Sequence, residues 1–375
     1  MLVITSRRLQ SALMLLIVTV PLFACASRPE NGYLTPVAGS SSITAEHTIL
    51  VATTRQRDTR PGTLFNGERT SSLDYASITV SVPPTHVPGK VELASSAPGK
   101  PEKSFVVRDA DYLDSEQAFI QSLNAQLAQR PPGSRRVLLF IHGYNTMFAE
   151  GLYRFAQVVH DSKAVAVPVL FTWASRGKVS EYVYDNNSAT VARNDLEHTL
   201  RLILASNAEE VNILAHSMGN WVTVEAFRQI KISGDLENTN KIGNVFLAAP
   251  DIDLDVFKAQ MRRIGRPDKP VYIVISKDDV ALGFSKFIAG GQVRVGDATN
   301  AQELADLGVT VIDLTNLEGE DASNHAKFAQ LTAVGPELRT VLGKGLGQST
   351  AQRQQSAAGT LGAILGAPIR IISGQ

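Results

Sequence analysis

The 375-residue sequence contains one cysteine, Cys25, which excludes any disulfide bond within the chain. It also lacks an excess of charge, because 36 Lys and Arg residues balance 36 Asp and Glu residues. No long basic run supplies the positive surface that the phosphate backbone of nucleic acid attracts. These absences exclude a disulfide scaffold, and they predict that nucleic acid is not a partner.

Signatures of cofactor binding are missing as well. The sequence has neither a phosphate-binding Walker loop nor the glycine-rich fingerprint of dinucleotide-binding proteins. Candidates such as His142 and Asp185 do not follow the short spacings that are typical of zinc ligands. We therefore predict no cofactor and no metal site.

The first 25 residues are typical of an export signal. Arg7 and Arg8 precede an apolar stretch, Leu9–Phe23, that is too short to span a bilayer comfortably. Leu22-Phe23-Ala24-Cys25 resembles the lipobox of bacterial lipoproteins, in which cleavage leaves the cysteine to carry the lipid. The alternative is an ordinary cleaved signal that happens to contain a cysteine. Ala26 in place of an acidic residue favours the outer membrane, by resemblance to Gram-negative lipoproteins, with acyl chains such as palmitate as the anchor.

Composition divides the rest of the chain into three parts. Residues 26–42 are rich in Pro, Gly, Ser and Thr, which predicts a flexible tether between lipid and domain. Residues 43–344 are expected to form one domain, and the low-complexity residues 345–375 a C-terminal tail. Three β-like runs between residues 43 and 130 are expected to be antiparallel edge strands. They are Thr48–Thr53, Tyr75–Val82 and Ser104–Val107.

Residues 136–344 show the pattern of an α/β protein. Short apolar runs alternate with amphipathic stretches, as in buried parallel strands joined by crossover helices. Strands are predicted at Val137–Ile141, Val167–Trp173, Val211–Leu214, Asn244–Ala248, Val271–Ile275 and Val309–Leu314. Helices are predicted at Asp114–Gln129, Thr146–Ser162, Ala189–Ala205, Gly219–Ile232 and Asp253–Arg263. We therefore predict a doubly wound, mostly parallel sheet preceded by antiparallel strands.

Ala215-His216-Ser217-Met218-Gly219 is the strongest chemical signal in the sequence. It lies between a predicted strand and a predicted helix, which is the context of a nucleophile elbow. A serine at such a tight turn stands clear of the sheet, so the residues two before and two after it must be small. Gly219 satisfies this requirement, and Ala215 departs from the usual glycine by one methyl group. We predict that Ser217 is a nucleophile.

His325 is the predicted general base. In folds with such an elbow the chain order is serine, acid, histidine. The other six histidines precede Ser217 or lie within the elbow, so only His325 follows it. They are His47, His86, His142, His160, His198 and His216. The alternative is that His325 is an ordinary exposed loop residue.

Two adjacent carboxylates, Asp278 and Asp279, compete for the role of the acid that orients the base. Both follow the predicted strand Val271–Ile275, and we favour Asp279, since the apolar residues after it can pack beneath the loop. Asp278 would then be a solvated turn residue. Asp251 and Asp253 are alternatives, because some folds of this kind supply the acid one strand earlier.

An oxyanion hole requires two backbone amides beside the nucleophile. One is expected from Met218, and the other from Tyr144, where Gly143 permits an unusual turn after a strand. His142 is expected to support this turn through hydrogen bonds rather than to act as a base.

Several segments together resemble bacterial α/β-hydrolases of unknown function that are similar to esterases and lipases. They are Phe140–Asn145, Phe171–Trp173, Ala215–Asn220, Ala248–Asp253 and Ser276–Leu282. The resemblance covers roughly Thr48 to Leu331. It implies an α/β-hydrolase fold with Ser217, Asp279 and His325 as the triad, but no particular substrate, because esterases, lipases, thioesterases and amidases share these features.

The space for a substrate cap is small, since only about twenty residues separate Pro250 from Val271. The segment Ala174–Asn187, together with Trp173, Tyr182 and Tyr184, could line an open aromatic cleft or form an ordinary solvated loop. We predict a serine carboxylesterase acting on short to medium acyl esters, either small molecules or lipid-like compounds. The alternatives are an envelope-tethered binding scaffold without catalysis and an amidase or protease with the same triad.

Two features have no interpretation from the sequence. Arg55, Arg57 and Arg60 cluster in the N-terminal strand region without an evident partner. The pattern also does not indicate an oligomeric state.

Overall fold

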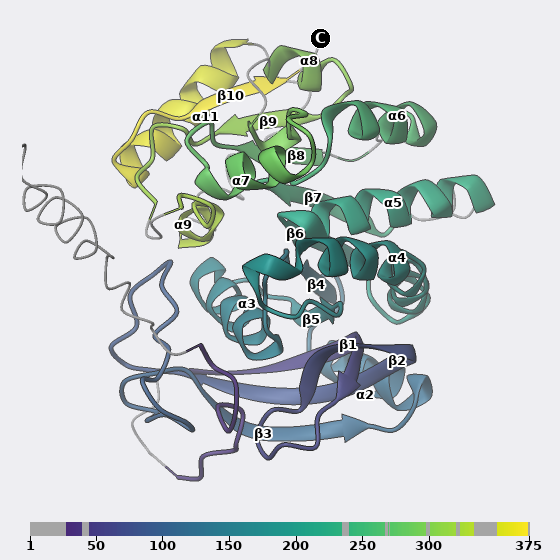
Figure 1. Cartoon of the computed structure of the whole chain (residues 1–375), viewed down its shortest axis with the longest axis vertical. Helices are drawn as coiled ribbons and strands as arrows, with labels where there is room; N and C mark the ends of the chain where they lie inside the picture. The colour runs from purple at the N-terminus through teal and green to yellow at the C-terminus, as the bar shows by residue number, and fades with distance from the viewer. Residues whose placement is uncertain are drawn as a thin grey trace, which may run out of the picture.

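A ten-stranded mixed sheet organises the part of the chain that the structure describes (Figure 1). The structure is a computed structural model and describes residues 28–39, 45–234, 240–266, 269, 271–297, 301–319, 323–333 and 351–373. The strand order is β10-β9-β8-β7-β6-β4-β5-β1-β2-β3. Figure 1 shows the purple N-terminal strands at one end of the sheet and the yellow C-terminal elements at the other.

The strands match the predicted runs closely at the centre of the sheet. They are β1 Ala45–Arg57, β2 Phe65–Val82, β3 Val106–Leu113, β4 Arg136–Ile141, β5 Val167–Thr172, β6 Glu210–His216, β7 Ile242–Ala248, β8 Val271–Ile275, β9 Thr310–Asp313 and β10 Arg370–Ser373. Strands β5, β4, β6, β7, β8 and β9 pair in parallel. Every residue of β5 is buried, as expected of a strand covered on both faces. The predicted α/β class with a mostly parallel sheet is confirmed.

Helices cover both faces of the sheet. They are α2 Glu116–Ala128, α3 Phe148–Ser162, α4 Tyr182–Ala205, α5 Met218–Ser233, α6 Leu254–Ile264, α7 Val280–Ile288, α8 Ala301–Ala305, α9 Phe328–Ala333 and α11 Ala351–Leu365. Residues of α2, α4, α5, α6 and α8 share one apolar core. Those of α3 pack in a second core together with Phe328 of α9, and Leu331 of α9 packs with α11 in a third. Of the described residues between β7 and β8, only α6 is helical, so no large cap covers the sheet there.

Strand β1 is an interior strand, and the prediction that it lies at an edge was wrong. It pairs in parallel with β5, with Leu50 opposite Val169, and antiparallel with β2. Residues 49–53 are all buried, because neighbours and helices cover both faces of the strand. Such an unbroken apolar run is typical of an interior strand. The edge position belongs to β3.

The described segment before β1, residues 28–39, packs on the domain instead of extending away from it. Tyr33 and Leu34 are buried, and the Leu34 amide donates to the Gly62 carbonyl at 2.9 Å. The Tyr153 hydroxyl donates to the Tyr33 carbonyl at 2.6 Å. The expected tether over residues 26–42 is therefore not flexible throughout, because two apolar side chains anchor its described part. Cys25 lies outside the described residues.

The C-terminal residues complete the sheet, in contrast to the predicted tail. Strand β10 pairs antiparallel with β9, and Ile371 lies opposite Ile312. Leu361 of α11 is fully buried in the core that covers this end of the sheet. An added strand with a covering helix protects an edge that would otherwise expose unpaired backbone groups.

No described helix is both long and apolar enough for a bilayer span.

Candidate active site

Ser217 occupies a strained turn at the carboxyl end of the central strand β6. Its φ is 54° and its ψ is −125°, a region that costs a residue with a side chain about 1–3 kcal/mol. Its amide donates to the Ala248 carbonyl at 3.0 Å, and its carbonyl accepts from the Asp251 amide at 3.2 Å. The Asn220 side chain donates to the Ser217 and Ala248 carbonyls, each at 2.8 Å. These bonds to neighbouring segments offset the strain and hold the serine at the apex.

Two glycines allow the backbone to pass directly against the serine. A Cβ added at Gly219 would lie 2.3 Å from the His142 carbonyl oxygen, and one at Gly143 would lie 2.6 Å from Ser217 Cβ. Neither contact leaves room for a side chain. The turn after β4, residues 142–145, therefore lies in backbone contact with the start of α5, as the elbow motif requires.

The predicted oxyanion amides come from these two segments. Met218 is the first residue of α5, and the first amides of a helix have no partner within it. The Tyr144 amide directly follows Gly143, and a Cβ added at Gly143 would lie 3.2 Å from Ser217 Oγ. The structure thus brings both segments beside the serine, whereas the role of the two amides stays a prediction.

A buried arginine supports the turn, which gives Arg55 a physical account. Its guanidinium donates to the Thr146 carbonyl at 2.7 Å, the Ser175 carbonyl at 2.8 Å and Thr172 Oγ1 at 2.8 Å. Burial lowers the pKa of Arg55 to about 10, against the opposing effect of the Asp185 carboxylate. The charged side chain therefore links the loops after β4 and β5 from beneath. Arg57 and Arg60 instead form ion pairs with Asp74 and Asp58.

Asp185 supports the same loops from the other side. Its carboxylate accepts from the Asn145 amide at 3.0 Å, the Arg176 amide at 3.0 Å and Ser175 Oγ at 2.5 Å. Burial raises the pKa of Asp185, and these three hydrogen bonds oppose the effect.

His142 lies beneath the turn as a neutral hydrogen-bonding residue. Its Nε2 accepts from the Trp173 amide at 3.2 Å, and its ring stacks on the Trp173 ring at 5.0 Å. Burial, followed by the charge of Arg55, lowers the pKa of His142 to about 3. Trp173 is itself fully buried, so it does not line the open cleft that the sequence suggested. Tyr182 is buried too and begins helix α4, which starts earlier than predicted.

His325 and Asp279 meet in a hydrogen bond. His325 Nδ1 lies 2.7 Å from Asp279 Oδ2, and the Asp279 side chain is fully buried. The other oxygen of Asp279 accepts from the Leu282 amide at 3.0 Å and caps α7. Because β6, β8 and β9 are parallel, the segments that follow them gather at one edge of the sheet. Ser217, Asp279 and His325 come from these three segments.

Asp278 is an exposed turn residue, as expected, and it also holds the loop that carries His325. Lys327 Nζ donates to both of its oxygens at 2.7 and 2.8 Å, and Asn324 Nδ2 donates at 3.2 Å. Burial raises the pKa of Asp278, but the hydrogen bonds from Lys327 and Ser276 outweigh it and leave the pKa below its ordinary value. Lys327, almost entirely buried, needs this counter-ion.

His216 joins the nucleophile segment to the base loop. Its ring centroid lies 4.6 Å from that of His325 and 4.5 Å from that of Phe328. Its Nε2 lies 3.2 Å from the His325 carbonyl oxygen. Sequence reasoning assigned it no role, although its place directly before the serine was a usable signal.

The alternative acids serve other purposes. Asp251 forms a buried ion pair with Arg294 at 3.2 Å and accepts hydrogen bonds from Tyr182, at 3.3 Å, and from Ser285. Asp253 caps α6 by accepting from the amides of its second and third residues. The contacts found for these two carboxylates do not involve His325.

Arg28 fastens the N-terminal segment to the oxyanion turn. It donates to the Asn145 side chain and carbonyl, each at 2.8 Å, and to Glu150 Oε1 at 2.7 Å. It also donates to the Gly177 carbonyl. No sequence pattern pointed to this contact, which joins residues more than 100 positions apart.

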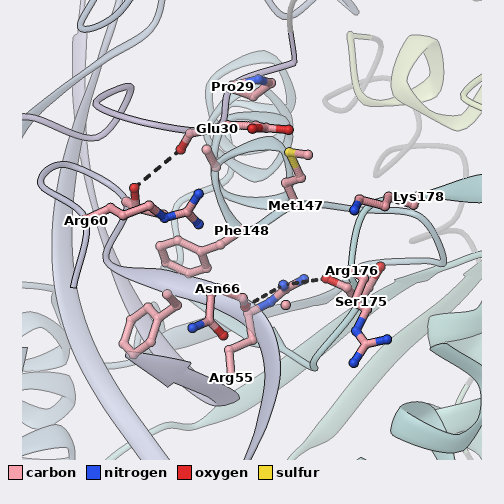
Figure 2. Close-up of a pocket in the computed structure, with 14 residues that line it drawn as sticks. Pro29, Glu30, Arg55, Arg60, Asn66, Met147, Phe148, Ser175, Arg176 and Lys178 are labelled. Carbon is pink, nitrogen blue, oxygen red and sulfur yellow. Dashed lines mark hydrogen bonds between the residues drawn. The ribbon is translucent and has the colours of Figure 1, made fainter. Parts of the chain in front are cut away.

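A cavity of about 220 Å³ lies between the N-terminal segment, β2, the start of α3 and the loop after β5 (Figure 2). Figure 2 shows Arg55 bonded to Asn66 and Ser175 at its floor. Arg176 at its rim is neutralised by Glu68 and Glu181. The described residues that line the cavity do not include Ser217 or His325, so it is separate from the candidate triad.

A comparison with protein families agrees with this architecture. A family model described as "Alpha/beta hydrolase of unknown function (DUF900)" matches residues 115–344. No curated protein sequence gives a significant match. A cell surface hydrolase from Lactobacillus plantarum WCFS1 is 9% identical with a TM-score of 0.33, over 60% of this chain and 98% of that one. A thermostable esterase from Pseudomonas putida ECU1011 is 14% identical with a TM-score of 0.33, over 78% and 82%.

Proposed function

The chain belongs to the α/β hydrolases of unknown function, since that family's model matches more than half of it, and we propose that it is a serine carboxylesterase. The observation that carries the proposal is the Asp279–His325 hydrogen bond at the same sheet edge as the strained Ser217. Together they have the residue types and the chain order of a serine hydrolase triad.

In the proposed reaction, Ser217 Oγ attacks the ester carbonyl while His325 removes its proton. Asp279 accepts a hydrogen bond from the Nδ1–H group of His325, which keeps Nε2 free to act as the base and stabilises the imidazolium. The amides of Met218 and Tyr144 bind the developing oxyanion. His325 then protonates the leaving alcohol, and water releases the acyl group from Ser217 in a second, equivalent step.

An apolar rim beside the acid supports an acyl ester as the substrate. Helix α7 begins directly after Asp279 and exposes Val280, Phe284 and Phe287. It meets the first turn of α4 through the Tyr182–Ser285 contact of 2.9 Å, where Val183 is also exposed. Exposed apolar side chains grouped at a site mark binding surfaces for apolar ligands. Without a deep cap, we propose short to medium acyl chains.

We propose further that a lipid on Cys25 tethers the protein to the bacterial envelope, with the outer membrane favoured. Arg28 is bound to the oxyanion turn, and three extended residues span at most about 11 Å. The anchor would therefore keep the catalytic edge close to the membrane, where lipid-like esters are present. A Cys25→Ser variant should move from the membrane to the soluble fraction after cell lysis, and continued membrane association would overturn the anchor.

The test of the reaction uses the full-length chain in detergent with p-nitrophenyl esters from acetate to palmitate. We expect hydrolysis that Ser217→Ala abolishes and Ser115→Ala, at the exposed cap of α2, leaves unchanged. A fluorophosphonate probe should form one covalent adduct on Ser217, which reports the nucleophile whichever substrate is used.

The two readouts separate the possible failures. Labelling without ester hydrolysis would overturn the esterase in favour of an amidase or protease. A folded protein that neither hydrolyses esters nor accepts the probe would instead support a scaffold without catalysis. Rates that rise steadily beyond ten carbons would contradict the preference for short and medium chains.

A further inference from the structure

Three histidines and two carboxylates gather at the end of the sheet opposite the candidate triad. His47 lies near the start of β1, and His86 and Glu92 lie in the segment after β2. His160 and Asp161 lie in the last turn of α3. Helix α3 begins beside the oxyanion turn and has 15 residues, which corresponds to about 22 Å at 1.5 Å per residue. The cluster is therefore remote from Ser217.

Three of these side chains converge as ligands of one ion would. One nitrogen of His86, one of His160 and one oxygen of Asp161 all lie within 4.8 Å of one another. His86 Nε2 is 2.8 Å from Asp161 Oδ1, and both side chains are more than nine-tenths buried. His160 is half-buried, which leaves the group accessible from one side.

A second layer of contacts fixes the orientation of each ligand. Glu92 lies 2.8 Å from His86 Nδ1, and His47 Nε2 lies 3.3 Å from His160 Nδ1. The Gly89 amide donates to the second oxygen of Asp161 at 2.7 Å. The Nδ1 atoms of both histidines are thus engaged, while His86 Nε2 faces Asp161 Oδ1. Metal-binding histidines characteristically use their other ring nitrogen in this way.

The charges around the group favour a cation. Asp161 and Glu92 supply two carboxylates beside the imidazoles.

We propose that His86, His160 and Asp161 bind a divalent transition-metal ion, of which Zn²⁺ is the best fit. Two imidazoles and one carboxylate provide three ligands of a tetrahedral site, with water as the fourth. The ion would fasten the loop after β2 to the end of α3. Sequence spacing did not reveal the site, because His86 and Asp161 are 75 residues apart.

The experiment uses the full-length protein without a histidine tag, dialysed against a chelator and then titrated with ZnCl₂ by calorimetry. We expect one Zn²⁺ per chain and a higher Tm, both unchanged in Ser217→Ala. Affinity should fall at least 100-fold in His160→Ala and Asp161→Asn. His198→Ala is the matched control, since this exposed histidine contacts only Glu116 among its described partners.

Circular dichroism checks that each variant folds. If Asp161→Asn does not fold, the Co²⁺ form of the wild-type protein provides the second readout, with the intense visible absorption of a tetrahedral site expected. Absence of Zn²⁺ binding to the wild type, or binding that both ligand variants retain, would overturn the proposal. Catalysis does not enter this test, so its result is independent of the proposed esterase activity.

Discussion

The two halves of the candidate active site are held by different forces. Ser217 is fixed mainly through its backbone: two glycines let facing segments pack against it, its turn is bonded to Ala248 and Asp251, and the Asn220 amide donates to its carbonyl. His325 is fixed by side chains, through Asp279 on its ring and the Asp278–Lys327 pair on its loop. The serine should therefore be sensitive to added volume, and the histidine to removed charge. Four substitutions or conditions test this difference.

Asp279→Asn should have the largest effect, on the side held by charge. The amide would no longer favour the Nδ1–H form of His325, so kcat should fall by a factor on the order of 10³–10⁴, as when a triad acid is neutralised. The asparagine can still cap α7, so the Tm should change little. Steady-state kinetics with p-nitrophenyl esters measures this. A loss below tenfold would show that another acid orients the base.

Gly219→Ala should have the next largest effect, on the side held by the backbone. The new methyl group would lie 2.3 Å from the His142 carbonyl oxygen, so the elbow must move. Overpacking of this kind typically costs about 1–3 kcal/mol in the free energy of unfolding. We expect at least a 100-fold loss of kcat, because misplacement of a reacting group by about 1 Å costs this much. Gly359→Ala is the control, since nothing lies within 4 Å of its added Cβ. If Gly219→Ala retained wild-type kinetics, backbone contacts would not be what fixes the position of Ser217.

Lys327→Met should have a moderate effect and separates the base loop from the base itself. Methionine fills the buried space of the lysine stem, while the partly exposed Asp278 becomes solvated. The His325 loop loses its tether, so we expect kcat to fall about 10- to 100-fold with KM unchanged. The double variant with Asp278→Asn should be no worse than Lys327→Met alone. Additive losses would indicate that the two residues act separately.

Lowering the pH should reduce the free energy of unfolding through His142, which supports the turn beside Ser217. The pKa of His142 is lowered to about 3 in the folded state. Below pH 6.5, His142 therefore becomes protonated in the unfolded chain but stays neutral in the folded chain. Stability is then complete above pH 6.5 and is lost toward pH 3, by at most about 1.4 kcal/mol per pH unit from this group. Urea denaturation at pH 7, 6 and 5 should show a smaller slope in His142→Asn than in wild type or His198→Gln. An identical slope in all three proteins would contradict this assignment.

Periodicity predicted the elements at the centre of the sheet because buried parallel strands have short apolar sequences with clear limits. The predicted range Val271–Ile275 matches β8 residue for residue. The same reasoning missed α11, whose small residues resemble a low-complexity tail. It also missed β10, which has only four residues and depends on a sheet edge for pairing. It also took β1 for an edge strand, since pairing in parallel with β5 depends on a crossover that no local pattern encodes.

The candidate site divides in the same way. Ser217 and Gly219 form a local motif, and elimination among the histidines selects His325, so the sequence by itself determined the α/β-hydrolase family and named the candidate triad. Only the tertiary structure decided which of two adjacent aspartates meets His325 Nδ1, and what Arg28, Arg55 and His216 contact. The physical reason is that these bonds join segments distant in the chain. Their geometry depends on how strands stack side by side, and residue type and spacing do not specify it.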